Sequence, residues 1–168
     1  MVSKLQVVDE KVRAVPASKQ ALRLWLRLFS SSTMIEQRMR QLLKDRFGTT
    51  LPRFDFMAML YRYPDGMSMG QLSRWLMVSN GNVTGVAERL EKEGLIRRDP
   101  SPTDRRSHIV TMTNKGREAF EEWATEHENW ITDLFAGLSP QEINSLIDLL
   151  AKAKASVEHS ENRHRKEG

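Results

Sequence analysis

The stretch from Ser79 to Thr84 places short polar side chains at the start of a predicted helix. Its members are Ser79, Asn80, Gly81, Asn82, Val83 and Thr84, and a second glycine, Gly85, follows. Asparagine can make two hydrogen bonds to an adenine edge, and a threonine methyl group can pack against a thymine methyl group. A glycine inside a helix costs about 1 kcal/mol relative to alanine, and the close approach of another surface is a reason to retain it. These residues predict hydrogen bonding to base edges in the major groove of DNA.

Basic side chains gather further along, in a predicted hairpin. Residues 95–117 contain six basic and two acidic residues, and their net charge of +4 equals that of the whole chain. Arg105 and Arg106 at the hairpin tip would meet phosphates or a narrow minor groove. Asp104 beside them is expected to hold an arginine in a fixed rotamer. Arg74, on the preceding helix, is a candidate phosphate contact, with an ordinary solvated arginine as the alternative.

Apolar periodicity and turn signals predict the elements that must position these residues. Apolar residues at spacings of three and four indicate one long helix from residue 21 to Gly48 and a second helix from residue 51. A capping-box pattern at Ser68 and Gln71 opens a short third helix, and Gly94 ends the fourth. Residues 95–99 and 107–112 are expected to be strands, since the prolines between them cannot continue a ladder. Further helices are expected from residues 113 and 139.

This order of elements is typical of a mainly α protein with a small β-hairpin. We expect a winged helix-turn-helix flanked by N- and C-terminal dimerisation helices, because the outer helices carry more apolar surface than one small winged module can cover. The expected organisation is a flexible N-terminus at 1–17, a long dimerisation and sensor helix at 18–50, the winged helix-turn-helix at 51–116, C-terminal dimerisation helices at 117–157 and a flexible tail at 158–168.

Composition excludes several other classes of protein. The 168 residues include no cysteine, which rules out thiol redox sensing and thiolate metal sites. The sequence has no run of about 20 apolar residues and no signal-peptide pattern, so a cytoplasmic location is expected. Four histidines are scattered, and no glycine-rich phosphate loop is present. We therefore expect no catalytic residues, no metal site and no cofactor.

A set of motifs in this region resembles the MarR family of bacterial transcriptional regulators. The family pattern Leu-Glu-x-x-Gly-Leu-Ile-x-Arg is matched by 90–98, Asp-x-Arg by 104–106, and Val-x-Leu-Thr-x-x-Gly by 110–116, with Met112 in place of leucine. The resemblance covers about residues 18–157. It implies a homodimer that reads a pseudo-palindromic DNA site with half-sites about 34 Å apart. It also implies that Ser79, Asn80, Asn82 and Thr84 face the groove and that Asp104 pairs with Arg106.

The resemblance also implies a repressor that a small molecule releases, often an aromatic acid bound between the dimer region and the DNA-binding lobe. Residues 51–55 and 79–85 look similar to regulators of aromatic-compound catabolism, including some that respond to aromatic acyl-CoA thioesters. An arginine at the mouth of an aromatic cleft suits a carboxylate or phosphate. The candidate ligand residues are Trp25, Phe29, Ser32, Arg53, Phe54, Met57 and Trp123. Aromatic and methionine stripes at helical spacing are also typical of an ordinary core.

Two functional hypotheses from different classes follow. The first is a ligand-responsive, DNA-binding regulator, most simply a repressor. The alternative is a winged helix used for protein association without DNA binding, which the acidic face of the helix after residue 113 would favour. A hydrolase or metal enzyme has no supporting cluster of residues. Gel-shift binding that falls with salt separates the first two hypotheses, because phosphate contacts are salt-dependent.

Overall fold

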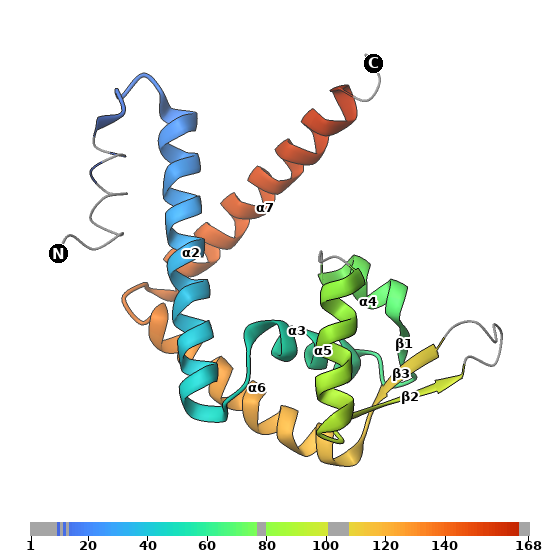
Figure 1. Cartoon of the computed structure of the whole chain (residues 1–168). Coiled ribbons are helices and arrows are strands. Elements are labelled where there is room, and N and C mark those ends of the chain that lie inside the picture. The colour runs from blue at the N-terminus through green and yellow to red at the C-terminus, as the bar shows by residue number, and fades with distance from the viewer. Residues whose placement is uncertain (1–9, 11, 13, 77–79, 101–107, 165–168) are drawn as a thin grey trace. The chain divides into compact units, whose positions relative to one another are not determined.

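Residues 10, 12, 14–76, 80–100 and 108–164 are described by the computed structural model (Figure 1). Side chains at 80, 82 and 161–164 are outside this description. The chain divides into two compact units, Met1–Trp130 and Ile131–Gly168. The elements are α2 (Gln20–Phe47), α3 (Leu51–Arg62), β1 (Met67–Ser68), α4 (Met69–Leu76), α5 (Asn80–Lys92), β2 (Ile96–Pro100), β3 (His108–Met112), α6 (Asn114–Leu134) and α7 (Pro140–His164).

Helix ends follow the signals in the sequence. Gly48 ends α2 in the left-handed conformation, with φ of 62°, which a glycine adopts without a steric cost. Pro52 lies in the first turn of α3, where its missing N–H needs no partner. At the start of α4 the Ser68 N–H donates to Gln71 Oε1 at 2.8 Å, and the Gln71 N–H donates to Ser68 Oγ at 3.2 Å. This reciprocal pair confirms the predicted capping box.

A second capping box opens α7 in the other unit. The Ser139 N–H donates to Glu142 Oε2 at 2.8 Å, and the Glu142 N–H donates to Ser139 Oγ at 3.3 Å. The Ser139 N–H and the Ser139 hydroxyl both donate to Glu142 Oε2, which favours the ionised carboxylate and lowers the pKa of Glu142. The helix then continues to His164, so Glu158–His164 is helical although the sequence predicted a tail from residue 158.

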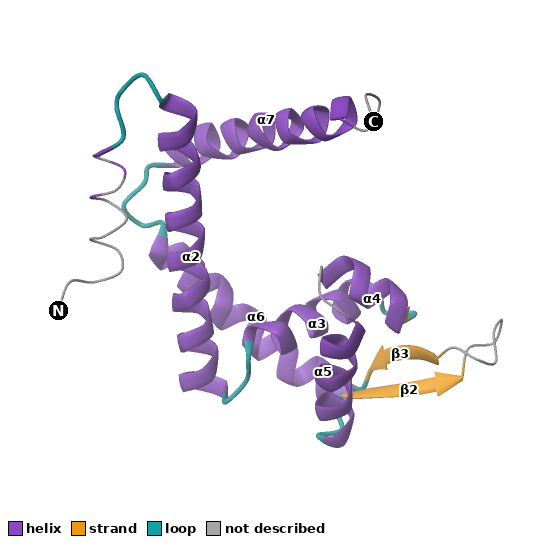
Figure 2. Ribbon diagram, turned by 45° about the horizontal axis from the view of Figure 1, so that its top comes forward, coloured by secondary structure: helices purple, strands orange, loops and turns teal. Residues whose placement is uncertain are grey.

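The sheet has one strand more than the predicted hairpin. Its order is β1-β3-β2 and both pairings are antiparallel, with Met67 opposite Val110 and Ile96 opposite Met112. Figure 2 shows β2 and β3 side by side. The two-residue β1 was missed because so short a strand has no detectable alternation. Pro100 was expected to lie beyond the ladder, but it is the last residue of β2 and lies opposite His108. A proline is tolerated at a strand end, where no further backbone donor is needed.

One apolar core joins these elements in the first unit. Its fully buried side chains come from α2, α3, α4, α5 and the sheet: Leu43, Phe56, Met57, Leu60, Leu72, Val83, Ala87, Leu90, Ile96 and Val110. Phe120 and Trp123 of α6 complete it. Tyr61 of α3 is exposed, and its hydroxyl donates to Glu121 Oε1 at 3.1 Å. Val12 is buried within the segment that the sequence predicted to be flexible.

Candidate nucleic-acid interface

Helices α4 and α5 form the helix-turn-helix expected from the sequence. Leu72 of α4 and Val83 and Leu90 of α5 are buried in the shared core, and the two helices pack against each other. The first turn of α5 begins at Asn80 and carries Gly81, Asn82 and the exposed Thr84. Ser79 lies outside the described residues. The structure therefore places the predicted groove-reading positions on one helix start whose orientation is fixed by core packing.

The face of α5 directed away from the core is formed by residues four and three apart: Gly81, Gly85, Glu88 and Lys92. A Cβ atom built at Gly81 or Gly85 would meet no atom within 4 Å. Internal packing therefore does not require a glycine at either position. Because glycine lowers helix stability, the close approach of an outside surface is one physical reason for a glycine here, and the space of a cleft that both glycines line is another.

The C-terminal end of α5 explains the first family motif. Gly94 has φ of 73°, and the Leu95 N–H donates to the Leu90 carbonyl at 2.9 Å, which closes the helix. Glu91 pairs with Arg98 of β2, whose Nε lies 2.8 Å from Glu91 Oε2. This hydrogen bond to Arg98 lowers the pKa of the Glu91 carboxyl. The glutamate and arginine of the motif thus attach the wing strand to the reading helix.

The third motif, residues 110–116, forms the junction between α5 and α6. Thr113 Oγ1 accepts the Gly116 N–H at 3.0 Å and lies 2.8 Å from the Gly94 carbonyl oxygen. A Cβ atom at Gly116 would lie 1.9 Å from the Leu95 carbonyl oxygen, so no other residue fits without displacing the backbone. The threonine and glycine of the motif therefore hold the start of α6 against the end of α5.

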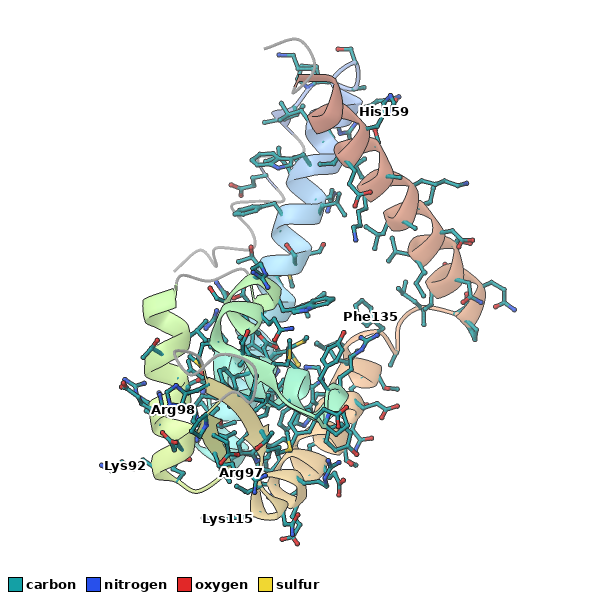
Figure 3. All side chains as sticks on the ribbon, turned by 90° about the vertical axis from the view of Figure 1, so that its right-hand side faces the viewer. Lys92, Arg97, Arg98, Lys115, Phe135 and His159 are labelled. Carbon is teal, nitrogen blue, oxygen red and sulfur yellow. The ribbon has the colours of Figure 1, made fainter. Side chains whose placement is uncertain are left out.

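Basic side chains in and beside the described part of the wing make ion pairs or hydrogen bonds within the protein. Arg97 Nε lies 2.9 Å from Asp99 Oδ2 and 3.0 Å from Thr111 Oγ1. Lys115 Nζ donates to the Glu93 carbonyl at 2.8 Å. Figure 3 shows Lys92, Arg97 and Lys115 where α5, β2 and α6 meet. Asp104, Arg105 and Arg106 lie outside the described residues, so their predicted roles remain predictions. Arg74 is exposed on α4 and makes no ion pair among the residues that the structure describes.

The seven candidate ligand residues fall into separate environments. Phe54, Met57 and Trp123 are buried in the core, where Phe54 packs on Phe120 and stacks on His127 with ring centroids 4.5 Å apart. Arg53 pairs with Glu93 at the end of α5, and its Nε has no hydrogen-bond partner among the residues that the structure describes.

The remaining three candidates lie on the N-terminal half of α2. Trp25 and Phe29 are 57% and 56% exposed and stack on each other, and the Ser32 hydroxyl donates to the Phe29 carbonyl at 3.1 Å. The structure of this chain alone does not assemble the predicted cleft from these side chains.

A cleft lies elsewhere in the first unit, between α2, α3 and α5. Its volume is about 490 Å³, and its walls include Leu51, Pro52, Leu76, Val83 and Val86 together with Gly81 and Gly85. Four charged residues line it: Glu36, Arg40, Asp55 and Arg89. Arg40 Nε donates to Glu36 Oε1 at 3.0 Å, whereas Arg89 has no ion pair among the described residues. Burial raises the pKa of Asp55, and the nearby Arg40 opposes that effect. The cleft was not predictable from the sequence because its walls come from four elements, α2, α3, α4 and α5, with Leu76 as the contribution of α4.

No helix in the described part of the chain is long and apolar enough to span a membrane. No group of three or more histidine, aspartate or glutamate residues there is arranged to hold a metal ion.

Comparisons with known proteins agree with this geometry. The MarR family profile matches residues 49–108. The chain is 34% identical to the HTH-type transcriptional regulator YkoM of Bacillus subtilis (strain 168) over 138 residues, which are 82% of this chain and 86% of YkoM. It is 37% identical to the transcriptional activatory protein BadR of Rhodopseudomonas palustris over 103 residues, 60% of this chain and 58% of BadR.

A solved structure supports the same assignment. The crystal structure of a MarR family transcriptional regulator from Silicibacter pomeroyi superposes with a TM-score of 0.71 at 29% identity, covering 85% of this chain and 99% of that one. The winged helix-turn-helix, the motif contacts and these relatives lead to one conclusion: the chain belongs to the MarR family of DNA-binding transcriptional regulators and is not an enzyme.

Proposed function

We propose that this protein is a repressor that binds a pseudo-palindromic operator as a homodimer and is released by a small aromatic acid or its CoA thioester. The observation that carries the DNA-reading part is the outward face of α5, where Gly81 and Gly85 serve no internal packing contact. Ser79, Asn80, Asn82 and Thr84 would read base edges from the start of the same helix. Arg105 and Arg106, oriented by Asp104, would meet the adjacent backbone or minor groove.

Exposed apolar surface on α7 supports the dimer. Ile147 is 58% exposed and Leu149 is 61% exposed, and both lie on a helix of the second unit. An apolar groove of about 370 Å³ in that unit is lined by Ile131, Thr132, Phe135, Leu138, Ile143, Leu146, Ile147 and Leu150. Stable monomers rarely leave such helices uncovered, so a second copy is the proposed occupant. Sedimentation should give twice the 19.4 kDa chain mass, and charged substitutions at Ile147 and Leu150 should lower it.

The cleft between α2, α3 and α5 supports an effector that acts on DNA binding. Its volume falls in the range of small-molecule sites, and α5 forms one of its walls. Arg89 would pair with a carboxylate above the apolar walls. A ligand here would bias the position of α5, a shift between two populations of the protein. A CoA thioester would place its acyl group in the cleft and its nucleotide outside.

Gel shifts with the DNA upstream of the protein's own gene test the DNA-reading part. Asn82→Ala should weaken binding to that DNA about tenfold or more and leave binding to an unrelated duplex nearly unchanged, since it removes a base contact. Arg106→Ala should weaken both and reduce the salt dependence. Binding that ignores both substitutions and is flat with salt would contradict the proposal.

Ligand screening tests the effector part. Aromatic acids and their CoA thioesters should raise the melting temperature and weaken DNA binding. Arg89→Ala should abolish both responses to the free acids, because it removes the partner of their carboxylate. An effector that binds free and DNA-bound protein equally well would contradict release. A strain that carries the upstream DNA fused to a reporter gene decides whether the protein represses or activates. Deletion of the gene for this protein should raise reporter expression. A fall in reporter expression would instead match an activator, which is what BadR is named as.

A further inference from the structure

An exposed aromatic pair lies beside the helix-turn-helix. Trp75, on α4, is 57% exposed although it is the largest side chain on that helix. Its indole packs on the ring of Tyr63, with centroids 6.3 Å apart and planes inclined by 41°. Tyr63 is itself 36% exposed. Exposed aromatic surface of this kind has an unfavourable contact with water that a binding partner would remove.

The charge around this pair favours an anionic partner. Helix α4, Met69–Leu76, contains no acidic residue, and its one charged residue is Arg74, the immediate neighbour of Trp75. Arg74 is exposed, and within the described part of the chain it forms no salt bridge. A guanidinium beside a flat apolar ring matches the alternation of phosphate and deoxyribose along a DNA strand, since the cation suits the phosphate and the ring suits the sugar.

The position of α4 beside α5 would bring α4 close to DNA that α5 binds. α4 packs directly on α5 and is followed by it in the chain after only three residues, 77–79. Trp75 therefore lies in the same unit as the DNA-reading helix, on the helix that packs directly against it.

We infer that Trp75, supported by Tyr63 and flanked by Arg74, contacts the sugar-phosphate backbone of the bound duplex. The contact positions the protein on DNA and reads no base. Arg74 supplies the electrostatic part and Trp75 the apolar part, so the two contributions differ in their response to salt.

Affinity measurements at several salt concentrations separate these contributions. The probes are the upstream DNA and an unrelated 30-base-pair duplex. Trp75→Ala should weaken binding to both about tenfold, because it removes apolar contact area, and leave the salt slope unchanged. Arg74→Ala should reduce the magnitude of the slope by about one, the share of a single phosphate contact. Arg62→Ala, at the exposed end of α3, is the matched arginine control and should leave the slope unchanged.

A fluorescence measurement tests the location directly. DNA should protect part of the tryptophan emission from acrylamide quenching in the unsubstituted protein, and Trp75→Phe should remove that protected part. Unchanged melting temperatures and sedimentation would show that the variants remain folded dimers.

Three results would overturn the inference. They are equal affinity of Trp75→Ala and unsubstituted protein for both duplexes, a loss confined to the upstream DNA, or a change in oligomeric state that makes a second copy the occupant of this surface. Unsubstituted protein is the positive control, since its failure to bind DNA would count against DNA binding itself and not against Trp75.

Discussion

At the scale of single residues, Gly116 and Gly85 have opposite surroundings. Gly116 is required by the inside of the protein, because its Cβ would overlap the Leu95 carbonyl oxygen. Gly85 has open space where its Cβ would be. The sequence places both on helices, so sequence alone gives no means of separating them.

Gly116→Ala should destabilise the protein by about 1–3 kcal/mol, the usual cost of forcing an extra carbon into a packed site. The shift should appear as a lower urea midpoint, and DNA affinity per folded molecule should fall because the end of α5 is displaced. An unchanged midpoint would mean that the junction between α5 and α6 relaxes without cost.

Gly85→Ala should have the reverse effect on stability. Alanine is favoured in a helix by about 1 kcal/mol, and no atom obstructs the added carbon. The urea midpoint should rise while binding to the upstream DNA weakens. A more stable variant with unchanged DNA affinity would show that nothing approaches this face closely.

At the scale of elements, the Glu91–Arg98 pair joins the reading helix to the wing strand. Its side chains are 35% and 29% exposed, so Glu91→Gln should cost under about 1 kcal/mol of stability. We expect a larger relative loss of DNA affinity, because the wing loses its attachment to α5. The charge-reversed double substitution Glu91→Arg with Arg98→Glu should restore affinity towards its starting value. Equal DNA affinity in the unsubstituted protein, Glu91→Gln and the double substitution would show that the ion pair does not position the wing for DNA binding.

Element boundaries were largely predictable because their signals are local. Gly48, Gly94 and the capping box of Ser68 and Gln71 depend on residues within about one turn of each other, and the structure has them where the sequence predicted. The partners of side chains were not predictable in the same way. Arg53 was assigned to a ligand, but it pairs with Glu93, forty positions along the chain. Such pairs depend on packing that no local pattern encodes.

At the scale of the whole molecule, His127 links folding to pH. It stacks on Phe54, and burial lowers its pKa from the ordinary value of 6.5. The unfolded chain therefore binds a proton more readily than the folded protein does. The contribution of His127 to the free energy of unfolding is therefore fully present above pH 6.5 and is lost as the pH drops from 6.5 towards the pKa of His127 in the folded protein.

The free energy of unfolding at pH 8 and pH 5.5 checks this linkage. It should be lower at pH 5.5, and His127→Gln should reduce the difference, because the remaining side chain does not titrate. A pH dependence that is the same in both proteins would assign the loss to other groups.

The open space beside Gly81 and Gly85 has an evolutionary consequence. A Cβ atom added at either position meets no neighbour within the protein, whereas the junction at Gly116 is constrained by backbone contact. After gene duplication, one copy can therefore acquire new operators through changes in a single helical turn while its folding requirements are met elsewhere. Differences in target genes between paralogues would then be concentrated in this turn.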